Sequence, residues 1–238
     1  MQDFLDRVLG DSVTPQPPLD ERAALAAVAL AAVLVLWRPA WRRTRHLVTI
    51  AHEGGHGVAA LLAGRRLSGI RLHRDTSGLT VSRGRPTGPG MVVTALAGYV
   101  APSVLGLVAA FMVSRGYAVG ALWVALALLA LLLLQIRNFF GLWAVLVAGS
   151  GVFAVSWWAP APLQVAVATA ATAFLLLAAP RPVLELQAQR RAGRAPHSDA
   201  DMLARLTPLP GGFWVAVFLV VTGAAALGGG ALLWQAAS

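Results

Sequence analysis

The chain has 238 residues, of which 58% are hydrophobic and only 12% are charged. Soluble globular domains carry about 25% charged residues, so this composition excludes an ordinary soluble protein and favours one polytopic membrane domain. The net charge is +9, but no basic stripe with interleaved aromatic residues occurs, so we expect no nucleic-acid partner. The chain has no cysteine, which leaves His, Asp, Glu or Asn as possible metal ligands.

Residues 1–22 form an acidic, proline-containing leader. The leader has neither a basic n-region nor an immediate apolar h-region, so we do not expect it to be a secretory signal peptide. Residues 23–238 are predicted to form a single transmembrane domain in the lipid bilayer.

Long apolar runs fill most of the chain after the leader. A spanning helix needs about 20 apolar residues, and candidate runs lie at 23–37, 46–64, 90–114, 117–135, 139–159, 161–179 and 212–235. The prediction is an all-α polytopic membrane protein with six or seven transmembrane helices. Arginines gather on the cytoplasmic side of membrane proteins, and their distribution between these runs favours an N-terminus inside. The loops at 65–89 and about 180–211 and the Arg137–Asn138 junction then share the cytoplasmic side.

The loop after the second run has a pattern of its own. In GIRLHRDTSGLTVSRG, Ile70 and Leu72 alternate with polar residues, and so do Leu79 and Val81. The intervening Asp-Thr-Ser-Gly sequence at 75–78 has the composition of a turn. We therefore expect a β-hairpin over about residues 67–84.

The second run contains His52-Glu53-Gly54-Gly55-His56, which fits the pattern H-E-x-x-H. Residues four apart lie on one face of a helix, so both imidazoles can bind one Zn²⁺. Glu53 lies one position round the helix, where it can accept a proton from the attacking water and pass it to the leaving amine. Three ionisable side chains within five residues of an apolar helix indicate a functional site. Hydrogen bonds between helices stabilise too little to offset the free-energy cost of burying these side chains.

At this motif the chain resembles the site-2 protease family of zinc intramembrane metallopeptidases, in particular its small bacterial branch. HEGGH in an early helix, the hairpin after it and GYVAPSVLG at 98–106 carry the resemblance, which extends from about residue 46 to 210. The resemblance implies a zinc cofactor, a bacterial cell membrane and regulated proteolysis in or beside transmembrane segments. It also implies that the hairpin, with Leu79 and Val81, pairs with an unwound substrate strand.

A catalytic zinc ion usually has three protein ligands, so a third ligand must come from elsewhere in the chain. The resembled family supplies an aspartate in a Leu-Asp-Gly motif, which this sequence lacks. Most other acidic residues lie in the leader, the hairpin turn or an arginine-rich loop, which leaves Asp199 as the preferred ligand and Asp201 next. Ser198-Asp199 could also be an ordinary helix N-cap. Asn138 lies near the family's substrate-binding asparagine, so it is either that residue or an alternative ligand.

Two other functions are compatible with the same polar cluster. A membrane transporter could use it as an ion or proton site, although the paired discontinuous halves of many transporters are absent from the sequence. A non-catalytic relative could keep the fold without the activity. For the preferred function, the expected partners are a membrane-protein substrate and the lipid bilayer.

Overall fold

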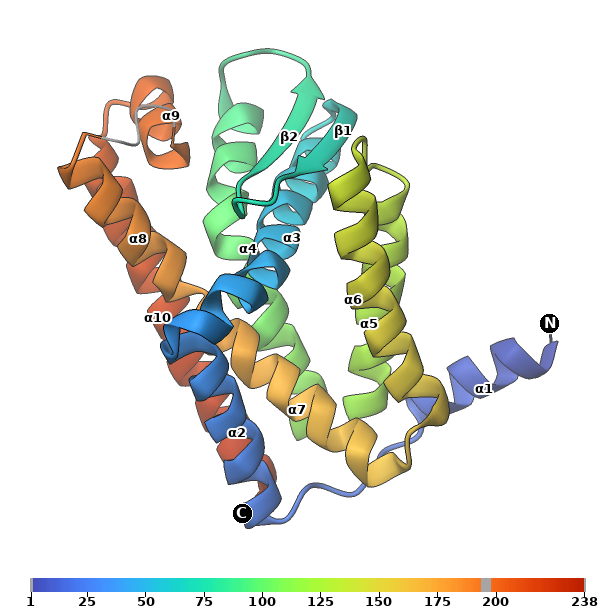
Figure 1. Ribbon diagram of the computed structural model, residues 1–238. Helices are drawn as coiled ribbons and strands as arrows, with labels where there is room; N and C mark the ends of the chain where they lie inside the picture. The colour runs from blue at the N-terminus through green and yellow to red at the C-terminus, as the bar shows by residue number, and fades with distance from the viewer. Residues whose placement is uncertain (1, 194–197, 238) are drawn as a thin grey trace.

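Helices dominate the fold, and Figure 1 shows their arrangement in the computed structural model, which describes residues 2–193 and 198–237. The elements in chain order are α1 (Gln2–Val13), α2 (Glu21–Leu36), α3 (Arg38–Leu62), β1 (Arg66–Leu72), β2 (Gly78–Arg83), α4 (Pro89–Ser114), α5 (Ala118–Leu133), α6 (Phe139–Trp158), α7 (Ala161–Ala178), α8 (Pro180–Arg191), α9 (Asp199–Leu206) and α10 (Gly211–Ala237). The two strands form an antiparallel pair. The predicted all-α architecture with one small hairpin is therefore confirmed.

Several helices are long and apolar enough to cross a membrane. In the described part of the chain these candidate spans are α4, α6, α7 continued by α8, and α10, and the bent pair α2–α3 makes a possible fifth. Helix α5 is apolar but has only 16 residues. The chain is therefore a multi-pass membrane protein, while the predicted count of six or seven crossings stays a prediction.

The first two predicted spans are not separate helices joined by a loop. Residues 38–45, expected between them, are the first turns of α3, and a bend of 98° separates α3 from α2. Trp37 is extended at this bend, and Pro39 fits the first turn of a new helix because no intrahelical donor is needed there. Figure 1 shows α2 rising from the end where the C-terminus lies and α3 ending at the hairpin. A pair bent this sharply is either one broken span or a re-entrant segment, so the predicted placement of the N-terminus inside stays a prediction.

The predicted loop at about 180–211 is largely helical. Pro180 and Pro182 lie in the first turn of α8, which follows α7 directly, and a second short helix, α9, precedes α10. Proline is tolerated in the first turn of a helix. The run predicted to end at residue 179 therefore continues directly into a second helix.

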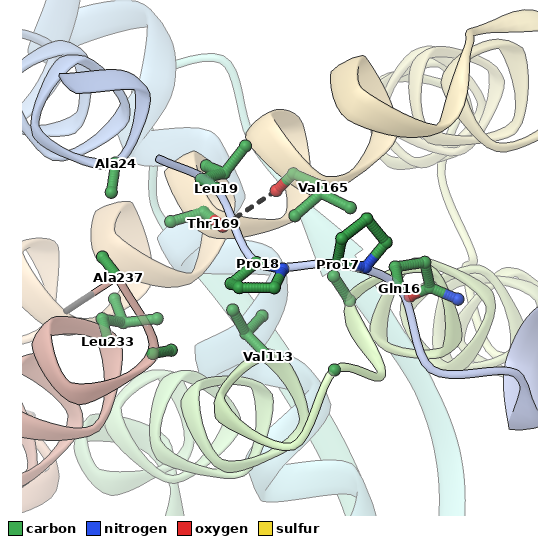
Figure 2. A pocket seen from close by; sticks show the side chains of 13 residues that line it. Gln16, Pro17, Pro18, Leu19, Ala24, Val113, Val165, Thr169, Leu233 and Ala237 are labelled. Carbon is green, nitrogen blue, oxygen red and sulfur yellow. Dashed lines mark hydrogen bonds between the residues drawn. The ribbon is translucent and has the colours of Figure 1, made fainter. Parts of the chain in front are cut away.

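The leader folds against the bundle. After α1, the backbone N–H of Gln16 donates to the carbonyl oxygen of Gly116 at 2.7 Å, and the Gln16 side-chain oxygen accepts from the N–H of Val119 at 3.0 Å. Figure 2 shows Pro17 and Pro18 in the adjoining pocket, which is apolar and only about 20 Å³ in volume. None of the side chains that line this pocket is ionisable, so it offers no chemistry.

The crossing of α3 and α4 is close because of glycine. A Cβ added at Gly55 would overlap the Ala101 side chain and lie 2.9 Å from the carbonyl oxygen of Ala97. Gly57 likewise brings β1 against α3, with the side chain of Ile70 3.3 Å from an added Cβ. Small residues permit such close approach between membrane helices. The HEGGH segment is thereby held between α4 on one side and the hairpin on the other.

Candidate metal centre

His52 and His56 lie one turn apart on α3 and converge with Asp199, the first residue of α9. The two Nε2 atoms are 3.1 Å apart, and the Oδ2 atom of Asp199 lies 3.3 Å from each of them. Residues 147 positions apart in the sequence are therefore joined in one cluster, as the Asp199 hypothesis required. Within the described chain, no other group of three or more His, Asp or Glu side chains converges in this way.

Helix α4 orients both imidazoles. The Nδ1 atom of His56 lies 2.7 Å from the carbonyl oxygen of Thr94, which can only accept, so Nδ1–H donates and Nε2 faces the cluster. The Tyr99 ring packs edge-on against His52 with the ring centroids 4.8 Å apart. A Cβ at Gly98 would overlap the His56 ring and lie 2.7 Å from that of His52, so only glycine lets α4 approach here.

Helix α9 is anchored so that Asp199 points at the histidines. Ser198 is the N-cap residue, and its hydroxyl accepts a hydrogen bond from the N–H of Asp201. The Asp201 carboxylate pairs with Arg190 of α8. Partial burial alone would raise the pKa of Asp201, but the hydrogen bonds from Ser198 and Arg190 outweigh it and hold that pKa below its ordinary value. Leu203 is fully buried against α4, α8 and α10.

Glu53 is buried beside the cluster, with only 4% of its surface exposed. The Thr80 hydroxyl of β2 lies 2.7 Å from Glu53 Oε2 and 3.0 Å from the Glu53 carbonyl oxygen. A Cβ added at Gly78 would overlap the Glu53 carboxylate. The start of β2 therefore covers Glu53 and supplies a hydrogen-bond donor to it.

The donor set fits a tetrahedral metal ion. Two donors bound at about 2.0–2.1 Å to one tetrahedral ion are about 3.3 Å apart, and the separations found are 3.1, 3.3 and 3.3 Å. Two neutral imidazoles and one carboxylate leave a fourth position free, which is typical of catalytic rather than structural zinc sites. The residues present can therefore hold a divalent metal.

In a comparison with protein-family models, residues 25–229 match the model described as Peptidase M50B-like. The chain belongs to the Peptidase M50B-like family. Membership supports a peptidase, and it agrees with the resemblance to site-2 proteases drawn from HEGGH. Neither the curated proteins nor the solved structures gave a match.

Asp201 and Asn138, the two alternative third ligands predicted for this M50B-like chain, bond to other groups. Asp201 is paired with Arg190 and Ser198 and is not part of the convergent group. The Asn138 side chain bonds the backbone of Leu72 twice, accepting from its N–H at 3.1 Å and donating to its carbonyl oxygen at 2.7 Å. Asn138 therefore fastens β1 to the start of α6.

The two edges of the hairpin differ. The segment before α6 pairs with β1, since Ile70 N–H donates to Gln135 and Arg137 N–H donates to Ile70. The outer edge of β2 has no strand partner among the described residues. Leu79 and Val81 are 49% and 42% exposed on β2. The predicted substrate-binding strand is thus the one with the available edge.

Sequence reasoning missed two threonines of the site. Thr94 and Thr80 reach the HEGGH segment across the α3–α4 and α3–β2 contacts. Both are ordinary residues for their segments, so composition and spacing carry no signal for them. For Thr80, its inward position in the predicted hairpin, between the outward Leu79 and Val81, is the one available hint.

Proposed function

We propose that the chain is a zinc-dependent intramembrane endopeptidase, which hydrolyses peptide bonds in or beside transmembrane segments of other membrane proteins. The observation that carries the proposal is the buried carboxylate of Glu53 next to converging donors on His52, His56 and Asp199. Membership of a peptidase family supports the reaction class. The long apolar helices support a substrate that is itself in the membrane.

The residues of the site would divide the work as follows. His52, His56 and Asp199 hold the ion, and a bound Zn²⁺ supplies a Lewis acid that polarises the scissile carbonyl and makes water more acidic. Glu53 accepts the proton of the attacking water and later donates it to the leaving amine. The Thr80 hydroxyl keeps the Glu53 carboxylate in one orientation.

The substrate would bind as an extended strand. Peptide bonds inside a helix are shielded by the surrounding turns, so the segment must unwind locally before water can attack. The open edge of β2 offers backbone donors and acceptors to such a strand. The exposed Leu79 and Val81 would contact its side chains.

A bacterial cell membrane, with the site on the cytoplasmic side, is the proposed location. Six arginines lie between α3 and α4, at positions 65, 66, 71, 74, 83 and 85. Basic residues in short loops favour the cytoplasmic side. We further propose that the bent pair α2–α3 is one broken span, which puts the N-terminus on the opposite side.

Cleavage by reconstituted protein tests this function. Wild-type protein in lipid nanodiscs should cleave single-span substrates, and chelation should stop cleavage until Zn²⁺ is restored. Glu53→Gln should retain zinc and lose cleavage, because the proton acceptor is removed while the ligands remain. Asp75→Asn, which removes an exposed carboxylate in the hairpin turn, is the matched control and should cleave normally.

Cleavage by Glu53→Gln at the wild-type rate would contradict the role of Glu53. Ion movement by wild-type protein without any cleavage would favour the transporter alternative instead. Absence of zinc from wild-type protein would favour a non-catalytic relative.

A further inference from the structure

A basic groove lies beside the metal cluster, between the end of β2 and α9. It is an open cavity of about 650 Å³, lined in part by Arg65, Ser82, Arg83, Met202 and Arg205. Figure 1 shows α9 facing the β2–α4 connection across this part of the molecule. None of the side chains assigned to the metal cluster lines the groove, so it is a separate site.

The positive charge of the groove is not compensated within the described chain. Its three arginines come from three different segments, no acidic side chain lines it, and none of the three forms an ion pair with a described residue. Arg65 is held in place by hydrogen bonds to the Ser82 hydroxyl at 2.9 Å and to the Arg85 carbonyl oxygen at 2.5 Å. These bonds orient the guanidinium but leave its charge free to attract an anion.

The nearby carboxylates are engaged elsewhere. Asp199 faces the histidines, Asp201 pairs with Arg190, and Glu53 accepts from Thr80. Arg83 and Arg205 are exposed. An anion that neutralises the groove must therefore come from another molecule.

The two walls of the groove are β2 and α9, and both lead away from the candidate site, β2 from Thr80 beside Glu53 and α9 from Asp199. Arg83 follows Thr80 by three residues on β2, which is about 10 Å along an extended strand. Arg205 follows Asp199 by six residues on α9, which is about 9 Å along a helix. An extended peptide whose scissile bond lies at Glu53 would therefore place a residue about three positions away among the arginines.

We propose that this groove binds acidic side chains in the segment that flanks the scissile bond, so that the enzyme selects membrane proteins with an acidic juxtamembrane segment. The planar guanidinium group is suited to bidentate pairing with carboxylates. Met91 and Met202 line the same groove and suit the aliphatic parts of a peptide, because methionine packs adaptably. The inference rests on the proposed peptidase function and adds the substrate class.

Peptide binding tests the groove without requiring cleavage. The probe is a fluorescent peptide that carries a transmembrane segment and an Asp-Glu-Asp flank, with Asn-Gln-Asn and Lys-Lys-Lys versions for comparison. Anisotropy is measured with zinc-loaded Glu53→Gln protein in nanodiscs of neutral lipid. We expect the acidic peptide to bind at least about 10-fold more tightly than the amide version, and high salt to weaken the preference.

Paired charge reversals locate the preference. Arg83→Glu/Arg205→Glu should abolish the preference for acid and favour the lysine peptide. Arg71→Glu/Arg74→Glu makes the same change of charge on exposed hairpin residues outside the groove and should leave the preference intact. Equal binding of the acidic and amide peptides, or equal loss of preference in both double variants, would overturn the inference.

Anionic lipid is the alternative occupant of the groove, and a separate vesicle-binding measurement tests it. If vesicles containing phosphatidylglycerol bind through Arg83 and Arg205 and the peptide shows no acidic preference, the groove is a lipid site and the inference is wrong. Glu53-dependent cleavage without a preference for the acidic peptide would support the proposed peptidase function and overturn the inference about the groove. A preference for the acidic peptide without any cleavage would support the groove as a binding site and contradict the proposed peptidase function.

Discussion

At the scale of single residues, the candidate site is a set of buried polar groups that satisfy one another. Glu53 is almost fully buried, and Thr80 supplies a hydroxyl donor to its carboxylate. His56 is fixed through Thr94. A buried carboxylate without such a partner is costly, because its desolvation is not offset. Thr80 is therefore a positioning residue for Glu53.

Thr80→Val should lower kcat by about 10- to 100-fold with KM nearly unchanged, since a hydrogen bond to a charged group contributes about 1.5–3 kcal/mol. Valine keeps the shape and removes the hydroxyl. Steady-state kinetics on a single-span substrate measures both constants. Thr80→Ser restores the hydroxyl and should recover most of kcat. A valine variant with wild-type kcat would show that Glu53 needs no partner on β2.

The H-E-x-x-H pattern alone predicted His52, Glu53 and His56, because residues i and i+4 lie on one face of any helix and the glutamate lies beside them. Asp199 was reached by excluding the other acidic residues, and the structure brings it to the two histidines. Thr80 and Thr94 could not be predicted, since their contacts exist only once the hairpin and α4 pack on α3.

At the scale of elements, the α3–α4 crossing fixes how closely the site is packed. Gly54 and Gly55 are neighbours in HEGGH but face different surroundings. An added Cβ at Gly54 meets only Leu132 at 3.8 Å, whereas at Gly55 it would overlap Ala101. The two glycines therefore form a matched pair for substitution.

Gly55→Ala should destabilise the protein by about 1–3 kcal/mol, because the extra methyl group forces α3 and α4 apart. Gly54→Ala should be neutral or stabilising by up to about 1 kcal/mol, since alanine favours a helix. Thermal unfolding in detergent compares the two variants with wild type. Equal melting temperatures for both alanine variants would contradict the close crossing at Gly55.

Elements were predictable where the local pattern agreed with the tertiary structure. Alternation and turn composition predicted the hairpin near its observed bounds. The prediction of a loop at about 180–211 was wrong where the apolar run ends, because Pro180 suits the first turn of a new helix. The docking of α9 was not predictable, since it depends on contacts of Leu203 with three other helices.

At the scale of the whole molecule, the hairpin and the C-terminus lie at opposite ends. Figure 1 shows the hairpin and α9 at one end and the C-terminus at the other. The arginines between α3 and α4 lie at the hairpin end, which favours that end in the cytoplasm. With α2–α3 taken as one bent crossing, we propose that α1 lies outside.

Single cysteines can test this orientation directly, because the natural chain has none. Asp3→Cys on α1 should react with a membrane-impermeant maleimide added to cells whose outer layers have been removed but whose cell membrane is intact. Arg74→Cys in the hairpin turn should react only after permeabilisation. Labelling of Arg74→Cys in intact cells, with protection of Asp3→Cys, would reverse the orientation.

The most direct measurement of the metal centre is the zinc content of two aspartate variants that differ by two positions on α9. Asp199→Ala should lose most of its zinc, because one of three ligands is removed. Asp201→Ala removes a carboxylate that pairs with Arg190 instead. It should keep about one zinc per chain, because the three ligands remain and the buried Leu203 still holds α9 in place. Gel filtration confirms that both variants are folded. Full zinc content in Asp199→Ala, or loss of zinc only in Asp201→Ala, would contradict the centre formed by His52, His56 and Asp199.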